Sequence, residues 1–408
     1  MNLEHLNNIQ SVMDSAVENK KIAGLNLMIY KDDKKIGYWQ SGYSDVENKK
    51  PFARDTICRM YSMTKTVTAA AALSLIEKGK IDIGEEVWRY LPFFKNLTVC
   101  DESGKGRNGK ARPASRPILV QDLLNMTSGY TYGAWWDGAP LGEHLTSDLV
   151  AELNHDADGI FSISTMDVAE RLSKIPVSFE PGRGYCYGFS ADILGALIQT
   201  VSGMKYSEFL KKTIFEPLGM KDTAFYVPQE KQSRLSKVYS SVEKDDFGKR
   251  ELLPFESPNL GIQHKMNHEP SFESGGAGLC STVDDYMRFV RMLTNGGELE
   301  GHRILQKKTV EFIARARLRS DLQEAFDRGM EHLSGYTYCN LMRVAVEPGK
   351  CKALTEEGEF GWDGWLGPYL SVDIKNTLAV VMTMQMTNAG TTDTTRRIKN
   401  IIYSSLAD

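Results

Sequence analysis

Ser62 and Lys65 are the residues of this sequence whose types and spacing point most directly to chemistry. They lie at the start of Met60–Gly79, where a run of strong helix formers follows and Gly79 supplies a stop. At positions i and i+3, the two side chains share one face of the first helical turn. A serine hydroxyl beside an amine, at a helix start rich in backbone N–H donors, is typical of an acyl-transfer centre.

The same Ser-x-x-Lys pattern occurs three times, beginning at Ser62, Ser202 and Ser241. The alternative interpretation of each is a capping serine with a surface lysine, because serine is a favoured N-cap. Ser202 directly precedes Gly203 and resembles a helix end, and Ser241 lies in a charged stretch. The pair at Ser62 opens a long helix with few charges, so it is the one we select.

The elements that must position this pair follow from hydrophobic periodicity. Strands are predicted over residues 24–31, 36–41, 336–346, 365–374 and 378–386. Helices are predicted over the N-terminal segment and over residues 62–78, 118–125, 146–154, 165–174, 190–202, 206–213, 283–293, 307–318 and 394–406. Residues 228–274 are polar and are predicted to be irregular.

Strands near both termini and helices between them indicate one sheet built from the two ends of the chain. We expect an α/β (α+β) fold with a mostly antiparallel sheet flanked by helices. Residues 1–80 and 335–408 would form the sheet part, and residues 81–334 a mainly helical insertion. The site would lie in the cleft between these two parts.

Composition narrows the classes of function. The chain has 408 residues, of which 41% are hydrophobic and 25% charged, and its net charge of −4 does not suggest a nucleic-acid partner. No run of about 18 apolar residues predicts a membrane span. The N-terminus lacks the apolar run of a signal peptide and the six cysteines lack Cys-x-x-Cys spacing, so we expect reduced thiols in a cytoplasmic protein. No metal or other cofactor is expected, and the sequence leaves the oligomeric state open.

Two further stretches have the composition expected around a reactive serine. One is the segment 180–195, with Tyr187 and Phe189, and the other is 360–368, with Trp362, Asp363 and Gly364. With these segments in this order, the chain resembles the serine β-lactamase and penicillin-binding-protein superfamily. It is most similar to the branch of class C β-lactamases, D-aminopeptidases and family VIII carboxylesterases. Supporting strings are QDLLNMTSG at 121–129, PLGMKDT at 217–223 and GGAGLCST at 275–282.

The resemblance implies a role for each matching residue. Ser62 would be the nucleophile, and Lys65 and Tyr187 would share the work of the general base, with the choice between them left open. The backbone N–H groups of Ser62 and Trp365 would form the oxyanion hole.

The departures from the family pattern bear on the substrate. The family's Tyr-x-Asn motif reads Tyr187-Gly-Phe189 here, and its Lys-Thr-Gly motif reads Trp362-Asp363-Gly364. The groups that meet the amide and the carboxylate of a β-lactam are therefore missing. We expect a carboxylesterase acting on a small-molecule substrate with a short or medium acyl group. Acyl transfer to an alcohol or amine is the alternative. A β-lactamase, a D-aminopeptidase or a non-catalytic binding protein is less expected.

The predicted substrate contacts each have a structural alternative. Trp135 and Trp136 would line an apolar acyl pocket or anchor their loop, and Trp362 and Trp365 would contact substrate or pack the sheet. Asp363 would repel an anionic substrate or face solvent. Phe189 and Gly364 complete the predicted substrate-binding set. No histidine lies beside these motifs and no Gly-x-Ser-x-Gly occurs, which argues against a Ser-His-Asp hydrolase.

Overall fold

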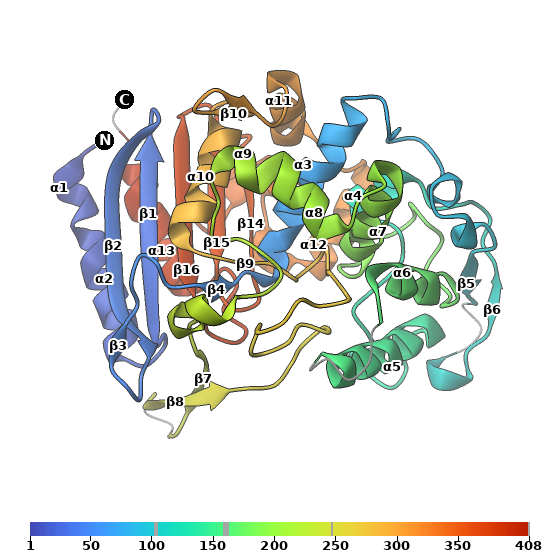
Figure 1. Ribbon diagram of the computed structural model, residues 1–408, viewed down its shortest axis with the longest axis horizontal. Coiled ribbons are helices and arrows are strands. Elements are labelled where there is room, and N and C mark those ends of the chain that lie inside the picture. Colours follow the sequence, from blue (N-terminus) through green and yellow to red (C-terminus); the bar gives the residue numbers. More distant parts are fainter. Residues whose placement is uncertain (102–104, 158–162, 246–247, 407–408) are drawn as a thin grey trace.

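Strands from the two ends of the chain form one antiparallel sheet, as predicted, in a computed structural model that describes residues 1–101, 105–157, 163–245 and 248–406 (Figure 1). The eight strands lie in the order β12 (Tyr336–Cys339), β13 (Met342–Ala345), β14 (Phe360–Asp363), β15 (Tyr369–Asp373), β16 (Leu378–Met384), β1 (Gly24–Lys31), β2 (Lys34–Asp45) and β3 (Lys50–Pro51). The predicted hairpin at residues 24–41 is β1 and β2.

The middle of the sheet is buried on both faces. All seven residues of β16 are buried, which explains why LAVVMTM shows no alternation of polar and apolar residues. Strand β3 forms one edge, and it is only two residues long and ends in Pro51. A short edge with a proline limits pairing with another chain.

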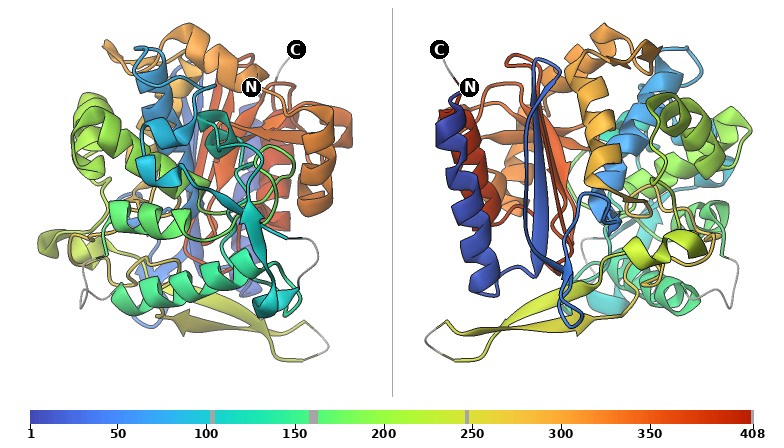
Figure 2. Two further views of the ribbon diagram at one scale, coloured as in Figure 1. Left: turned by 90° about the vertical axis from the view of Figure 1, so that its right-hand side faces the viewer. Right: turned by 60° about the vertical axis from the view of Figure 1, so that its left-hand side comes forward.

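Helices cover both faces of the sheet (Figure 2). Helices α1 (Leu3–Leu6), α2 (Asn8–Glu18) and α13 (Asp393–Ser404) lie on one face, where Ile9, Met13, Ile398 and Ile402 join a core with β1 and β16. Helix α10 (Val283–Thr294) packs on the other face against β16 and β1. Helix α3 (Thr64–Ile76) lies beyond α10 and belongs to the larger core.

Helix α3 is the central helix of the fold. Twelve of its thirteen residues are buried, as expected for a helix that is apolar on all sides. Helix α7 (Ser190–Ser202) packs against it. The other helices are α4 (Val120–Leu124), α5 (Leu141–Asp156), α6 (Thr165–Ser173), α8 (Tyr206–Leu210), the π-helix η5 (Lys211–Phe215), α9 (Glu216–Leu218), α11 (Lys307–Arg315) and α12 (Ser320–Gly329).

A two-stranded ribbon fixes the chain immediately before Ser62. Strand β4 (Cys58–Arg59) pairs with β9 (Cys280–Ser281), and Met60 N–H donates to Leu279 O at 2.8 Å. The segment 275–282 is thereby held beside the start of α3. The remaining two-stranded sheets are β5 (Thr98–Cys100) with β6 (Ala111–Pro113), β7 (Val238–Glu243) with β8 (Arg250–Phe255), and β10 (Glu298–Leu299) with β11 (His302–Arg303).

Three predicted elements differ from the structure. The strand predicted over 336–346 is a hairpin, because Asn340 and Leu341 adopt left-handed φ angles of 51° and 59° and reverse the chain. The strand predicted from Trp365 begins at Tyr369, and Trp365 itself lies in a turn after the unpredicted strand β14. Part of the segment predicted to be irregular, 228–274, forms the β7–β8 hairpin. The boundaries of the two predicted parts of the chain stay a prediction.

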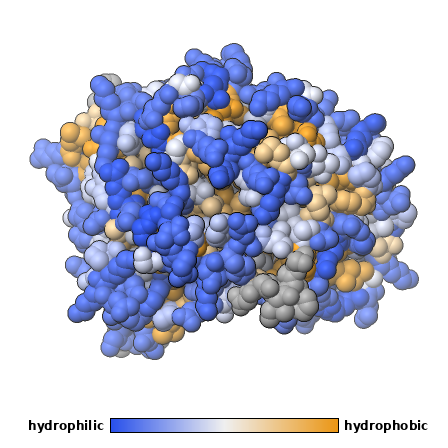
Figure 3. All heavy atoms as spheres, viewed as in Figure 1, coloured by the Kyte–Doolittle hydropathy of each residue, from blue (hydrophilic) through white to orange (hydrophobic). Residues whose placement is uncertain are grey.

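The surface in the view of Figure 3 is mostly hydrophilic, with hydrophobic side chains in small groups between charged ones. Within the described residues, every helix is too short or too polar to cross a lipid bilayer.

Candidate active site

Ser62 lies in a tight turn that leads into α3. The turn is the 3₁₀ helix η1 (Tyr61–Met63), and Ser62 is half-buried within it. Tyr61 has a left-handed φ of 44°, which is rare for a residue with a large side chain. Its buried ring is held edge-on against Trp365, with the ring centroids 5.0 Å apart. Packing thus maintains a costly backbone conformation beside the predicted nucleophile.

Lys65 reaches back from the first turn of α3 to Ser62. Its Nζ lies 3.2 Å from Ser62 Oγ, 2.9 Å from Tyr132 OH and 2.8 Å from Gly276 O. The side chain is fully buried, and burial lowers the pKa of Lys65 to about 7, although the negative charge of Asp192 acts against this shift. Near neutral pH, a fraction of Lys65 is therefore an uncharged amine that can accept a proton.

Tyr187 is the second predicted partner, and it lies just before α7. Its hydroxyl accepts a hydrogen bond from Trp362 Nε1 at 2.8 Å, and its ring centroid is 4.7 Å from Lys65 Nζ. Burial raises the pKa of Tyr187 far above 10, although hydrogen bonds with Ser62 and Trp362 partly oppose this. The phenol is therefore neutral at neutral pH. The structure brings Ser62, Lys65 and Tyr187 together.

Two contacts of Lys65 were missed from the sequence. Tyr132 follows the string QDLLNMTSG and opens the aromatic loop, so a signal was present, but only the tryptophans of that loop were selected. Gly276 belongs to the string GGAGLCST, which was used only as a family signature. Since the acceptor is its backbone carbonyl, its side-chain type carries no signal for this role.

The turn after β14 approaches Ser62 from the sheet. A Cβ on Gly364 would lie 2.3 Å from Met60 O, so glycine is required for this close approach. The next residue, Trp365, packs its ring on Tyr61 and donates from Nε1 to Asn388 Oδ1 at 2.7 Å. The backbone of Trp365 thus lies in the turn that faces the nucleophile, where an oxyanion-hole donor is expected.

Aromatic rings form a continuous wall beside the catalytic pair. Phe189 is buried, with its ring centroid 4.9 Å from that of Tyr132. Trp362 is 5% exposed and lies 5.6 Å from the ring of Tyr187 and 4.8 Å from that of Tyr338. These rings keep water away from Lys65, which is the physical cause of its lowered pKa.

Three other residues predicted to contact the substrate have no contact with Ser62 or Lys65 among the described interactions. Asp363 accepts hydrogen bonds from the backbone N–H and the hydroxyl of Thr391 at 2.7 and 2.6 Å, so its carboxylate holds a loop. Trp135 and Trp136 are 89% and 63% exposed. Such exposure does not support an apolar acyl pocket at these two residues, and the ring of Trp136 lies over Gly138 of its own loop. Their role in substrate binding stays a prediction.

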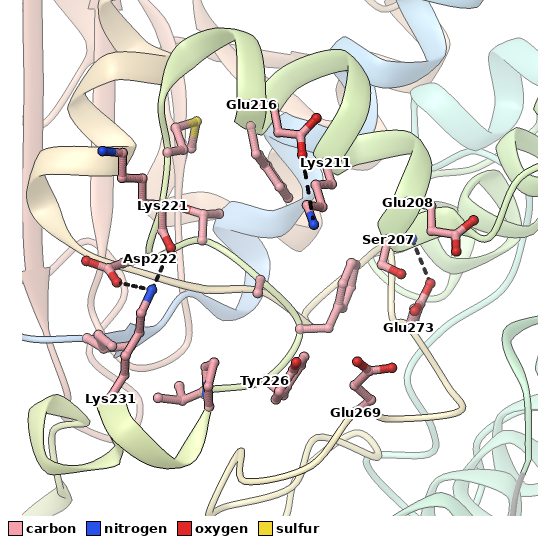
Figure 4. A pocket seen from close by; sticks show the side chains of 18 of the residues that line it. Ser207, Glu208, Lys211, Glu216, Lys221, Asp222, Tyr226, Lys231, Glu269 and Glu273 are labelled. Carbon is pink, nitrogen blue, oxygen red and sulfur yellow. Dashed lines mark hydrogen bonds and ion pairs between the residues drawn. The ribbon is translucent and has the colours of Figure 1, made fainter.

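A separate pocket lies elsewhere on the molecule (Figure 4). It encloses about 690 Å³ between α8, α9 and residues 219–231, and it is not lined by Ser62, Lys65 or Tyr187. Charged side chains around it pair with one another: Lys211 with Glu216, Lys231 with Asp222, and Lys205 with Glu273. Within each pair the two charges compensate each other. Because the pocket is separate from Ser62, we do not assign it to the reaction.

A serine hydroxyl in contact with a buried lysine, and not with a histidine, is typical of serine hydrolases of the Ser-x-x-Lys class. The chain belongs to the Beta-lactamase family, because the model of that family matches residues 9–403.

Comparison with individual proteins agrees with this assignment. The chain is 25% identical to esterase EstB of Burkholderia gladioli over 289 residues, which cover 69% of this chain and 68% of that protein. It is 25% identical to monacolin J acid methylbutanoyltransferase of Aspergillus terreus over 329 residues, or 79% and 74% of the two chains. Among solved structures, the fold is similar to that of EstCE1, a hydrolase with promiscuous acyltransferase activity. The TM-score is 0.78 at 22% identity, covering 98% of this chain and 99% of that one. The expected β-lactamase-like fold is confirmed.

Proposed function

We propose that this protein is a carboxylesterase that cleaves short or medium acyl esters through an acyl-enzyme on Ser62. The observation that carries the proposal is the 3.2 Å contact between Ser62 Oγ and Lys65 Nζ, made by a buried lysine whose pKa is lowered to about 7. A group that exchanges its proton near the working pH is the efficient general base.

In the proposed reaction, Ser62 Oγ attacks the ester carbonyl carbon while uncharged Lys65 takes the hydroxyl proton. The backbone N–H groups of Ser62 and Trp365 hold the oxyanion as the C–O double bond becomes single. When the tetrahedral intermediate collapses, the bond to the leaving alkoxide breaks. Tyr187 donates its proton to that oxygen and regains one from Lys65. Water then repeats the sequence on the acyl-enzyme and releases the acid.

The site composition favours an ester over a β-lactam. Phe189 and Trp362 present rings where the family pattern has an amide and an ammonium group, and both rings are buried. Neither side chain can pair with the carboxylate of a β-lactam. The 25% identity to an esterase supports the same substrate class.

The test uses p-nitrophenyl butyrate and a fluorophosphonate probe with the whole chain. Wild type is expected to hydrolyse the ester and to be labelled once, and Ser62→Ala to do neither. Ser202→Ala is the matched control, because Ser202 opens another Ser-x-x-Lys match at the end of α7 and is expected to leave both readouts unchanged. Equal inertness of wild type and Ser62→Ala would contradict the proposal.

Transfer of the acyl group to an alcohol or amine is the second candidate, favoured by the 25% identity to a methylbutanoyltransferase. Both reactions share the acyl-enzyme and differ in what accepts the acyl group. Adding candidate alcohols to the unlabelled enzyme together with p-nitrophenyl butyrate separates them. Faster release of p-nitrophenol with formation of a new ester indicates transfer, and an unchanged rate with acid as product indicates hydrolysis.

We also propose the two-part division, with residues 1–80 and 335–408 forming one part and 81–334 the other, and a cytoplasmic location. The location is supported by six free thiols, four of them buried, which fit a reducing compartment.

A further inference from the structure

Asp192 is a buried carboxylate beside the catalytic lysine that the proposed reaction does not use. It lies in the first turn of α7 and is 2% exposed. Its Oδ1 accepts hydrogen bonds from Ser274 Oγ at 2.5 Å and from Gly276 N at 3.1 Å. Ser274 Oγ also accepts from Ala277 N at 2.9 Å. The carboxylate is therefore locked to the turn at residues 274–277.

That turn connects Asp192 to Lys65 through one residue. Gly276 donates its N–H to Asp192 and accepts from Lys65 Nζ at its carbonyl, at 2.8 Å. A Cβ on Gly276 would lie 2.7 Å from Tyr132 OH, 2.8 Å from Asp192 Oδ2 and 3.3 Å from Lys65 Nζ. The three polar groups thus surround a single point, and the absence of a side chain at Gly276 lets them gather there.

The groups that set the charge around Lys65 are a carboxylate and several neutral phenols. The negative charge of Asp192 acts on Lys65 and, together with that of Asp363, on Tyr187. Burial raises the pKa of Asp192, whereas the charge of Lys65 and the hydrogen bonds from Ser274 and Gly276 favour its ionised form. The charge of Asp192 also acts on three phenols, those of Tyr132, Tyr187 and Tyr206. Burial raises the pKa of each, so all three are neutral. Burial lowers the pKa of Lys65 and the negative charge opposes this effect. Removal of that charge would therefore leave burial unopposed.

We propose that Asp192 is a positioning residue that holds the 274–277 turn against Lys65 and, through its charge, sets the pH at which Lys65 gives up its proton. The inference rests on the proposed function, since it assigns a role in the same reaction. The hydrogen bonds of Asp192 go to Ser274 and Gly276 and not to Ser62, so its proposed effect on the reaction is indirect.

The test is the pH dependence of kcat/KM for p-nitrophenyl butyrate in Asp192→Asn. Asparagine keeps an oxygen for the hydrogen bonds from Ser274 and Gly276 but removes the charge. The midpoint of the acid limb is expected to fall by about one pH unit, because an opposite charge several ångströms away no longer favours the ammonium form. At high pH, where Lys65 is uncharged in both proteins, kcat/KM is expected to stay within about tenfold of wild type.

Asp285→Asn is the matched control. Asp285 is also a buried carboxylate, but it lies at the start of α10 and bonds to Asp222 N and Thr223 Oγ1. Burial raises the pKa of Asp285 to about 6, so this variant tests whether a buried carboxyl group without contact to Lys65 contributes to the acid limb. Asp285→Asn is expected to leave the midpoint at the wild-type position.

Each outcome decides between the claims. A folded Asp192→Asn enzyme with lower activity and an unchanged midpoint would overturn the role of the charge, while Ser62-dependent activity of wild type would keep the proposed function. If Ser62→Ala is as active as wild type, the proposed function itself is overturned. If Asp192→Asn does not fold, Ser274→Ala replaces it. That variant removes one donor to the carboxylate and is expected to shift the midpoint in the same direction by a smaller amount, and an unchanged midpoint there would also overturn the inference.

Discussion

Two buried lysines in this molecule have opposite acid–base properties. Lys65 in α3 is 0% exposed, and its contacts are a hydroxyl, a phenol and a backbone carbonyl. Lys399 in α13 is 6% exposed and lies 2.9 Å from the carboxylate of Glu359, which Arg343 also contacts at 3.1 Å. The pKa of Lys65 is lowered to about 7, whereas that of Lys399 is raised despite the same burial, because of the charge of Glu359.

The comparison shows that burial alone does not decide whether a lysine is charged. Glu359 contacts Lys399 directly and compensates the cost of removing the ammonium group from water. Asp192 is connected to Lys65 through Gly276 and compensates this cost only partly. Lys399 and Glu359 therefore hold the sheet and α13 together, and Lys65 stays available to a substrate proton.

Lys65→Met is expected to have the largest effect on activity. Loss of the amine removes the proposed base, so kcat/KM for p-nitrophenyl butyrate should fall by about 10⁴-fold. Stability should not fall, because methionine removes a group whose charged form is disfavoured in the folded state. Urea unfolding of both proteins checks the second point. A variant that keeps a tenth of the activity would show that Lys65 is not the base.

Glu359→Gln is expected to have the largest effect on stability. It leaves Lys399 and Arg343 buried without their carboxylate, which costs about 3–5 kcal/mol in the free energy of unfolding. Glu356→Gln is the control, since Glu356 pairs with Lys375 at the surface and should contribute at most about 1 kcal/mol. If the two substitutions lower the free energy of unfolding equally in urea titrations, the buried Glu359 contributes no more than the surface Glu356 and the prediction is wrong.

The two lysine sites also predict different pH ranges. Lysine-based catalysis should lose about tenfold in kcat/KM per pH unit below pH 7, because the pKa of Lys65 is about 7 and only its uncharged form accepts a proton. The pKa of Glu359 is lowered to about 2 in the fold, so its stabilisation is complete above the unfolded value of about 4.3 and is lost as pH falls toward 2. A pH–rate profile and unfolding curves at several pH values should therefore change in separate ranges. Activity that is independent of pH between about 5 and 8 would exclude Lys65 as the titrating group.

Trp362→Phe is expected to have the smallest effect. It keeps a ring in the aromatic wall but removes the N–H that donates to Tyr187 OH, so kcat/KM should fall by about three- to tenfold. Trp88→Phe is the control, because Trp88 lies apart from the site against Arg89 and Lys95, and no change is expected. An identical loss in both variants would assign the effect to packing.

The sequence predicted most of the sheet and the grouping of Ser62, Lys65 and Tyr187 for identifiable reasons. Strands β1 and β16 are long and mostly apolar, and the Ser62 pair opens a helix without surface charges. Strand β14 was missed because its four residues, Phe-Gly-Trp-Asp, show no period. The turn at Asn340–Leu341 was missed because neither residue is a glycine or a proline, although both adopt left-handed φ angles.

The missed parts of the site depend on contacts between distant segments. Tyr132 and Gly276 meet Lys65 only in the folded chain, where α7 packs on α3, α4 packs on α7, and the β4–β9 ribbon lies beside the start of α3. Trp135 and Trp136 were predicted to contact the substrate because their loop is rich in aromatic residues. The residue types of a loop do not show whether it projects into solvent. The hydroxyl of Tyr132 and the carbonyl of Gly276 are chemically ordinary groups, and only their position in the fold brings them to Lys65.

The burial of α3 on all sides has a consequence for how such enzymes diversify. A helix that touches the core on every face tolerates few substitutions, so inheritance must preserve the reactive pair almost as a unit. The segment 275–282 beside Ser62 is buried as well, so substitutions are expected to be tolerated best at exposed positions such as Trp135 and Trp136, in the loop that Tyr132 opens. New substrates can therefore be acquired at the margin of the site, by changes that neither unfold the protein nor alter its chemistry.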